Sequence, residues 1–303
     1  MSTVVTPGRS GTTRPLDTAA EVVASKLPRG RRRTTATVVG GLFLAATCMI
    51  MFAPFLWTIM ASTKPTREAF ANPPVFVYTP TLTAFVDLWQ TTDFYLYLIN
   101  TLVVAVITTV VALLVGLPCA YALSRFPGYI SAGLLILALI FRALPRFAVV
   151  LPMYDISRSL GVYDTTYALA AALIAINQPF TIWLLRNFFA EIPRELDEAA
   201  MVDGCTRLQM LVKVMIPLMG PGILTAGIFT FLFGFQEYLT AAILTDTTSK
   251  TVPVFIATQL GQTLPMLQQA AAATVLLTIP VIGIAFVAQK YLVAGLNSGA
   301  VKG

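Results

Sequence analysis

Three charged residues lie within otherwise apolar stretches of the sequence: Arg142, Arg146 and Glu237. An unpaired charge in apolar surroundings is costly, so each of these groups must meet an opposite charge, hydrogen-bond acceptors, donors or water. The planar guanidinium of arginine can bind the hydroxyls or an anionic group of a solute through several donors at once. Alternatively, Glu237 neutralises an arginine in the resting protein, or an arginine extends its head group to the aqueous boundary. The chemistry that these residues could perform is recognition of a polar solute, and a purely structural role is the alternative.

Other polar side chains lie at the ends of, or inside, the same apolar stretches. Amides in such places most often hydrogen-bond between helices, and this is the preferred explanation for Asn100, Asn177 and Gln178. Tyr121, Trp183 and Tyr238 fit either a membrane-boundary belt of aromatic residues or the wall of a solute path. The predicted path residues are Arg142, Arg146, Glu237, Tyr238 and Asn100.

The sequence carries no recognisable catalytic or metal-binding constellation. It has no histidine and no group of cysteines or carboxylates at metal-ligand spacing. The dipeptide Gly-Lys is absent, and with it the phosphate-binding loop G-x-x-x-x-G-K-[ST]. We therefore expect no enzymatic activity and no cofactor in this chain.

A second group of polar residues forms an acidic segment, and these are Glu191, Glu195, Asp197, Glu198 and Asp203. Acids near a helix start interact favourably with the helix dipole, and a glycine such as Gly204 often ends a helix. These features predict a short helix over residues 194–203. Leu196 and Met201 could anchor it in a partner's apolar groove, and the small residues Ala199 and Ala200 would permit close approach. A solvated surface helix is the alternative.

The elements that must position these residues are membrane-spanning helices. The chain has 303 residues, of which 57% are hydrophobic and 11% charged, and its mean hydropathy is +0.79. Soluble domains have roughly 25% charged residues. Continuous apolar runs without strand-like alternation predict an all-α membrane protein with six spans. The spans are expected at residues 34–63, 94–124, 129–152, 166–185, 220–244 and 269–289.

Within the third span, Arg142 and Arg146 are four residues apart and are therefore expected on one face of one helix. Arg142 would lie about 20 Å along that helix from its start. A charge at this depth should face the interior of the bundle or a cavity.

Residues 1–33 are rich in Ser, Thr, Pro, Gly and Arg, and we expect them to form a disordered basic tail before a six-helix transmembrane domain at 34–303. The apolar run that follows is too long for a cleaved signal peptide. Lysines and arginines concentrate in the tail and in the acidic segment, which predicts that both termini and this segment face the cytoplasm. The net charge of +6 is explained by this asymmetry and requires no nucleic-acid partner.

The acidic segment also carries a motif. Glu198-Ala199-Ala200 is followed by Gly204 after three residues and, after nine more, by Val214-Met215-Ile216-Pro217. This pattern resembles the EAA motif of permeases from binding-protein-dependent ABC importers, with Val214 and Ile216 as conservative departures. Further stretches are similar to the carbohydrate-uptake permeases of the maltose-system second-subunit type. These are "AYALSRF" at 120–126, "LPMYDISRSLGVYDT" from Leu151, "FQEYLTAAILT" from Phe235 and "GAVKG" at 299–303.

The resemblance implies a six-helix type I importer permease whose coupling helix, about residues 194–204, seats in a cytoplasmic ATPase. It implies coupling roles for Glu198, Ala199, Ala200, Asp203, Gly204 and Pro217, and for Lys302 near the ATPase. The implied partners are a sister permease subunit, two ATPase subunits holding ATP and Mg²⁺, an extracytoplasmic substrate-binding protein and the lipid bilayer. The implied location is the prokaryotic inner membrane.

The solute expected from the resemblance is a sugar or sugar-like compound. Phe235-Gln236-Glu237 and Pro145-Arg146 depart from the Trp-Asn-Glu and Pro-Pro common in relatives, and a polyol or a glycerophosphodiester stays open as an alternative. A self-sufficient secondary carrier is a further alternative. Such carriers show paired, interrupted helices in two matching halves, a pattern that we do not find in the sequence.

Overall fold

A computed structural model describes residues 29–126 and 128–300 of the chain, and every regular element within them is helical. Among these residues, four helices are long and apolar enough to cross a membrane. Two strongly bent helix pairs raise the number of candidate spans to six when each pair is counted as one span. The predicted all-α membrane fold is confirmed.

The unbroken candidate spans are α2 (Arg29–Thr63), α5 (Phe94–Arg125), α8 (Thr166–Glu191) and α15 (Leu264–Ala300). One bent pair joins α6 (Tyr129–Ala143) to α7 (Arg146–Ser159) at 88°. The other joins Arg207–Leu218 to α12 (Gly220–Phe235) at 80°. The shorter helices are α3 (Thr66–Ala69), α4 (Thr83–Thr91), α9 (Glu195–Val202), α10 (Arg207–Met210), η1 (Leu211–Met215), α11 (Ile216–Leu218), α13 (Leu239–Leu244) and α14 (Val252–Gln259).

Two predicted spans differ from the structure. The third was expected to be one helix over residues 129–152, but it breaks between Ala143 and Arg146. Pro145 cannot donate a backbone hydrogen bond, and Leu144 before it adopts the extended conformation that a following proline favours (ψ 145°). The fifth was expected over residues 220–244, but α12 ends at Phe235 and α13 begins at Leu239.

The chain forms two compact units, and the first ends at Leu56. Helix α2 begins at Arg29, so residues 29–33 are helical although the sequence assigns them to the tail; the rest of that tail lies outside the described residues. In this unit α2 exposes large apolar side chains such as Phe43 and Met49, each 75% exposed. Apolar exposure of this kind suits a helix that faces lipid or another subunit.

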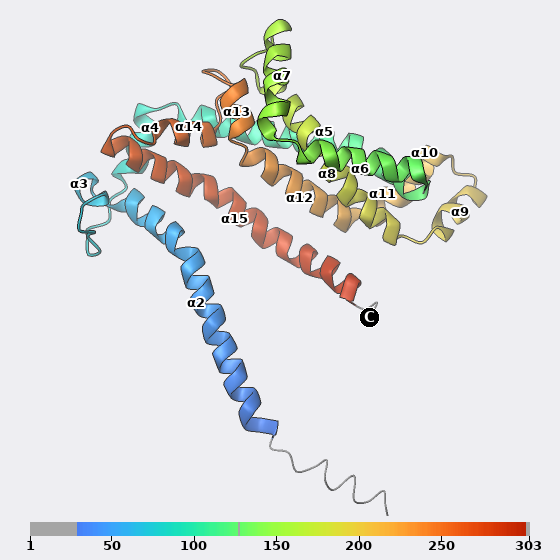
Figure 1. Cartoon of the computed structure of the whole chain (residues 1–303), viewed down its shortest axis with the longest axis horizontal. Coiled ribbons are helices and arrows are strands. Elements are labelled where there is room, and N and C mark those ends of the chain that lie inside the picture. Colours follow the sequence, from blue (N-terminus) through green and yellow to red (C-terminus); the bar gives the residue numbers. More distant parts are fainter. Residues whose placement is uncertain (1–28, 127, 301–303) are drawn as a thin grey trace, which may run out of the picture. The chain divides into compact units, whose positions relative to one another are not determined.

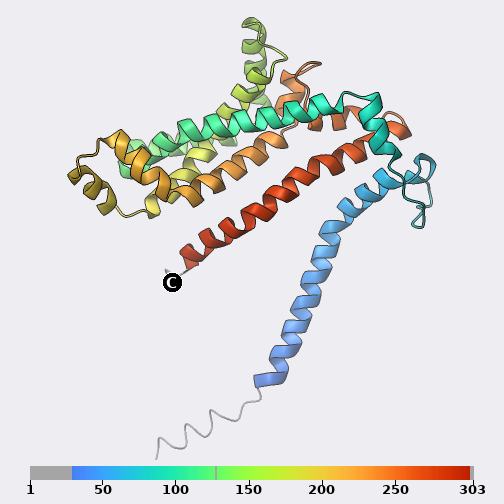
Figure 2. The ribbon, with the colours of Figure 1, turned by 180° about the vertical axis from the view of Figure 1, so that it is seen from behind.

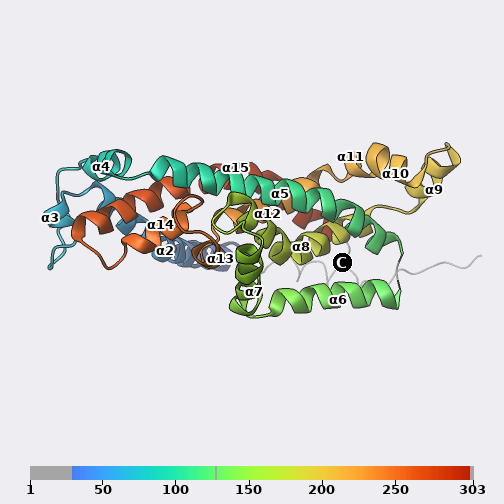
Figure 3. The same cartoon turned by 90° about the horizontal axis from the view of Figure 1, so that it is seen from above.

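In the second unit, α5, α8 and α12 lie side by side, with α15 along α12 (Figures 1 and 2). Small residues allow this close packing. A Cβ added at Gly234 would lie 3.3 Å from the Cα of Ala105, and one at Gly116 would lie 3.2 Å from Nε2 of Gln178. Helix α6 runs beside α8, as the view from above shows (Figure 3).

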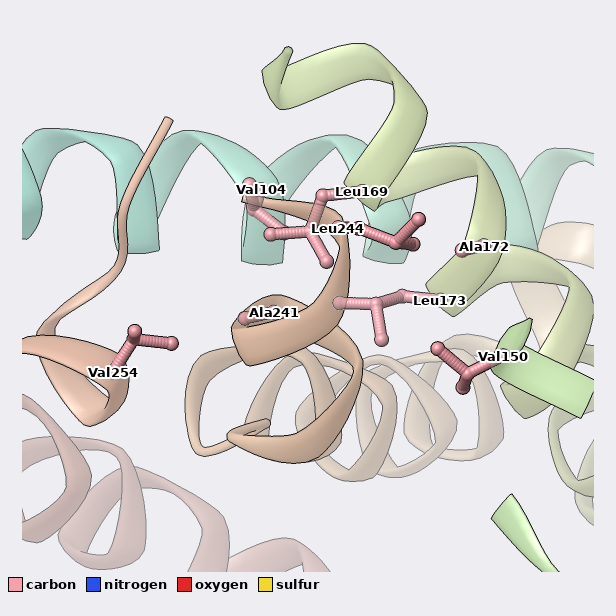
Figure 4. Close-up of a cluster of buried hydrophobic side chains, with 8 residues drawn as sticks. All are labelled: Val104, Val150, Leu169, Ala172, Leu173, Ala241, Leu244 and Val254. Carbon is pink, nitrogen blue, oxygen red and sulfur yellow. The ribbon is translucent and has the colours of Figure 1, made fainter. Parts of the chain in front are cut away.

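A buried apolar cluster joins α5, α7, α8, α13 and α14 (Figure 4). Leu169 and Leu173 of α8 are fully buried in this cluster, together with Val104 of α5 and Leu244 of α13. The cluster holds two short helices against the long ones. These are α7, which follows the break after α6, and α13, which follows the end of α12.

One carboxylate ties two loops of the second unit together. Asp164, between α7 and α8, adopts a left-handed conformation (φ 56°), and its side chain accepts backbone N–H bonds from each residue of the segment 246–249. Burial alone would raise the pKa of this carboxyl. The bonds from Asp246, Thr248 and Ser249 stabilise the anion more strongly and hold the pKa well below its usual range.

Candidate functional site

The helix predicted at residues 194–203 is present as α9 (Glu195–Val202). Glu195, Asp197 and Glu198 occupy its first turn, where the dipole favours acids. Gly204 adopts the left-handed conformation (φ 82°) that ends a helix, and its N–H donates to the carbonyl of Met201 at 3.1 Å. The N–H of Cys205 donates to the carbonyl of Ala200, which completes a Schellman motif.

Helix α9 exposes most of its side chains, including apolar ones. Val202 is 87% exposed, and Leu196 and Met201 are about half as exposed. Glu198 and Ala199 are also exposed, as is Asp203, which caps the C-terminal end of α9. An eight-residue helix with exposed apolar side chains and a fixed end is suited to docking into a partner's groove.

Ala200 differs from the prediction. It was expected, together with Ala199, to let a partner approach the helix, but Ala200 is buried at 6% exposure within this chain. The two alanines are adjacent and therefore point in different directions around the helix. Only Ala199 lies on the exposed surface.

Arg125, at the end of α5, is a site residue that sequence reasoning did not single out. Its guanidinium forms a buried ion pair with Asp197 of α9. It also donates to the backbone carbonyls of Phe189 at 3.2 Å and Ile192 at 3.1 Å, at the end of α8. Burial raises the pKa of the Asp197 carboxyl, and the guanidinium of Arg125 acts in the opposite direction. Arg125 thus fastens α9 to the ends of two membrane helices.

The segment after Gly204 leads back to the membrane helices. Thr206 and Gln209 form a reciprocal capping box that starts α10. The chain continues through the π-helix η1, whose residues Leu211 and Met215 are buried in a cluster with residues of α5 and α8, and then through α11, which contains Pro217. The 80° bend follows. A Cβ added at Gly222, just beyond it, would lie 2.7 Å from the ring of Phe188.

The two predicted arginines of the third span lie on different helices. Arg142 is near the end of α6 and Arg146 is the first residue of α7, so the expectation of a single helix face was wrong. The break at Leu144 and Pro145 separates them. Both nevertheless line one cavity of about 260 Å³, together with residues from α6, α7 and α8. The lining consists of Phe141, Arg142, Leu144, Arg146, Val149, Met153, Ala175, Ile176 and Pro179.

Glu237 pairs with Arg146, at 2.5 Å between Oε2 and Nη1. Its other oxygen accepts from the N–H and the hydroxyl of Thr240, at 3.1 and 2.9 Å, in the first turn of α13. An ion pair with Glu237 is the predicted alternative to substrate contact for these arginines. The structure assigns that pair to Arg146, so a single carboxylate links the two helix breaks.

Arg142 has no carboxylate partner among the described residues. Its guanidinium lies over the rings of Phe180 and Phe233, 4.7 and 5.0 Å from their centroids. One terminal nitrogen, Nη1, is buried with no hydrogen-bond partner in the described part of the chain. Ring faces stabilise the charge of a guanidinium but cannot accept its in-plane hydrogen bonds.

The remaining predicted residues lie elsewhere. Asn100 donates to the carbonyls of Thr248 and Lys250, so it holds the 246–251 loop and does not line the cavity. Tyr238 is 47% exposed in the break between α12 and α13. Lys302 lies outside the described residues.

Comparison with known proteins adds an independent line of evidence. The family model described as "binding-protein-dependent transport system inner membrane component" matches residues 112–298. The chain is 36% identical to the trehalose transport system permease protein SugB of Mycobacterium tuberculosis, over 90% of this chain and all of that protein. It is 32% identical to the trehalose/maltose transport system permease protein MalG of Thermococcus litoralis, over 88% of this chain and 96% of that protein.

A solved structure shows the same fold. The chain is similar to a chain in the crystal structure of a bacterial ABC transporter involved in the import of the acidic polysaccharide alginate. The TM-score is 0.73 at 25% identity, and the match covers 88% of this chain and 99% of that one.

Proposed function

The chain belongs to the family of binding-protein-dependent transport system inner membrane components, and on this premise we propose that it imports a sugar or sugar-like solute. It is a permease subunit of an ABC importer. The observation that carries the proposed mechanism is α9, a short exposed helix fastened through Arg125 to α5 and α8. We propose that α9 and the residues that flank it, 194–204 in all, form the coupling helix.

In this mechanism α9 docks into one of two partner ATPase subunits, which hold ATP and Mg²⁺ and hydrolyse the nucleotide. Glu198 and Asp203 supply charge at the contact, Ala199 permits close approach, and Leu196, Met201 and Val202 supply exposed apolar area. Gly204 and Pro217 fix where the chain turns back toward the membrane. Lys302 adds a contact near the ATPase. Movement of α9 with the closing ATPases shifts the ends of α5 and α8 through Arg125.

The orientation follows from the same arrangement. The chain's lysines and arginines concentrate in the tail and around α9, and this supports the proposal that both termini and α9 lie in the cytoplasm of a prokaryotic cell. The loops around Asp164 and residues 246–251 then face outside, where a substrate-binding protein delivers the solute. A sister permease subunit forms the other wall of the path.

The solute class is proposed from the relatives. Two of them carry trehalose, or trehalose and maltose, in their names, and the solved transporter is described as importing alginate. We propose that the path in this chain includes Arg142, with Arg146 and Glu237 holding the cavity wall and Tyr238 beside it. In this proposal Asn100 affects the path indirectly, because it holds the 246–251 loop in place. The alternative solute is a polyol or a glycerophosphodiester, which Arg142 and Arg146 could bind through hydrogen bonds.

Reconstitution of the complete importer in liposomes tests this function. Sugar uptake should require ATP, the ATPase subunits and the binding protein, because this chain only forms a path. Replacement of Glu198 by Arg should abolish uptake and the stimulation of ATPase activity, while the binding protein still binds its sugar. Gradient-driven uptake by this chain alone would contradict the proposal and favour a secondary carrier.

A further inference from the structure

The cavity between α6, α7 and α8 carries one positive charge that nothing in the described residues neutralises. Two arginines line it, and none of its described lining residues is acidic. Glu237 compensates Arg146 from outside the lining. Within the described part of the chain, Arg142 has only the ring faces of Phe180 and Phe233 as partners.

The aromatic rings cover the face of the Arg142 guanidinium and cannot accept hydrogen bonds from the N–H groups at its edge. The rings of Phe180 and Phe233 interact with the face of the guanidinium and fix its orientation, and no acceptor among residues 29–126 and 128–300 meets its buried Nη1. A full charge without an opposite charge nearby is an unfavourable arrangement, and an anion in the cavity that Arg142 lines can relieve it. A planar guanidinium held in this way is prepared to bind a two-oxygen anion.

A break between two helices also borders the cavity. The α6–α7 break, with its 88° bend, contributes Leu144 to the cavity wall. Within a membrane, interrupted helices are tolerated where the freed backbone groups line a cavity or are buried in protein. The cavity volume of about 260 Å³ lies near the lower limit of ligand pockets, so it has room for one small unit.

We propose that this cavity binds the anionic group of an acidic saccharide, a carboxylate or a phosphate, with Arg142 as its specificity-determining residue. This inference rests on the proposed import function and narrows its solute class from sugars in general to negatively charged sugars. Neutral sugars would leave the charge of Arg142 uncompensated, and a cationic amino sugar would be repelled by it.

Arg158 provides a matched control. Its guanidinium also lies over two aromatic rings, those of Tyr154 and Tyr163 at 5.8 and 5.1 Å, but none of these three residues lines the cavity. Substitution of either arginine therefore removes a ring-stacked positive charge, and only one of the two charges borders the cavity.

The test uses the complete importer without its binding protein, in nanodiscs of neutral lipid, titrated calorimetrically with glucose, glucuronate and glucose 6-phosphate. Wild type should bind one or both anionic probes more tightly than glucose, and the better probe identifies carboxylate or phosphate. Arg142→Gln should weaken the affinity for the anionic probes by about 10- to 100-fold and leave the affinity for glucose unchanged. Arg142→Lys should be intermediate, and Arg158→Gln should match wild type.

Equal affinity for the three probes, no binding of either anion, or an equal loss in Arg158→Gln would overturn the proposal. A separate measurement distinguishes this failure from failure of the import function. ATP-dependent uptake of a neutral sugar at the same rate by wild type and Arg142→Gln would remove the acidic-saccharide inference and leave the importer intact. Absence of ATP-dependent uptake of every solute that the binding protein delivers would overturn the import function itself.

Discussion

At the residue scale, the end of α9 depends on a backbone conformation that few side chains adopt. Gly204 has φ 82°, and a Cβ added there would meet no atom within 4 Å. The cost of a substitution is therefore backbone strain alone, about 1–2 kcal/mol for most residues and less for asparagine. We expect Gly204→Val to reduce sugar uptake and ATPase stimulation strongly, and Gly204→Asn to retain most of both. Equal activity of the two variants would contradict this account of the turn.

Asp197 and Arg125 form the second prediction at this scale. Removing one member of a buried ion pair leaves the other charge uncompensated, at a cost of about 3–5 kcal/mol. Asp197→Asn should lower the thermal stability of the purified importer and separate ATP hydrolysis from uptake. The double variant Asp197→Asn with Arg125→Gln should lose less stability than the sum of the single variants. Strict additivity would show that the pair is not coupled.

At the element scale, the packing of α12 on α8 can be tested with two glycines of one helix. A Cβ at Gly222 would lie 2.7 Å from the ring of Phe188, whereas a Cβ at Gly220 would meet nothing within 4 Å. Gly222→Ala should therefore destabilise the protein by about 1–3 kcal/mol through overpacking. Gly220→Ala, the matched control, should be neutral or slightly stabilising, as judged by thermal unfolding in detergent.

The loop link made by Asp164 should depend on pH. Its folded pKa lies below the unfolded value of about 3.9, so its contribution is present above that pH and is lost as the pH falls toward the folded pKa. Asp164→Asn keeps a residue that tolerates φ 56°, but it removes the charge and replaces one accepting oxygen with an amide NH2 group, which can only donate. The variant should unfold at a lower temperature than wild type at pH 7, and the difference should shrink below about pH 4. A difference independent of pH would contradict this role.

Local elements could be predicted from the sequence, and contacts between distant elements could not. The helix ending at Gly204 follows from neighbouring residues, because acids, an apolar pair and a glycine act within a few positions. The break at Leu144 and Pro145 was missed although proline signals it, because the apolar run continued through it. The ring stacking of Arg142 on Phe180 and Phe233 depends on how α8 and α12 pack beside α6, and the spacing of single residues does not encode that packing.

At the scale of the whole molecule, the proposed orientation can be tested with cysteines. We expect Cys205, next to α9, to react with a membrane-impermeant maleimide in inside-out vesicles and not in intact spheroplasts, after Cys48 and Cys119 are replaced by Ser. Val77→Cys in a protein without native cysteines should react in the opposite pattern, because Val77 is 92% exposed in the segment after α2. Labelling of both sites from the same side would refute the proposed topology.

Arg125 has a further consequence for how this protein tolerates change. Its hydrogen bonds to α8 end on the main-chain oxygens of Phe189 and Ile192, and those oxygens are present whatever side chains occupy the two positions. The ion pair of the joint depends on the side chains of Arg125 and Asp197, whereas its hydrogen bonds to α8 do not depend on the side chains at positions 189 and 192. Other side chains of similar volume at positions 189 and 192 would therefore keep the hydrogen bonds between Arg125 and the end of α8.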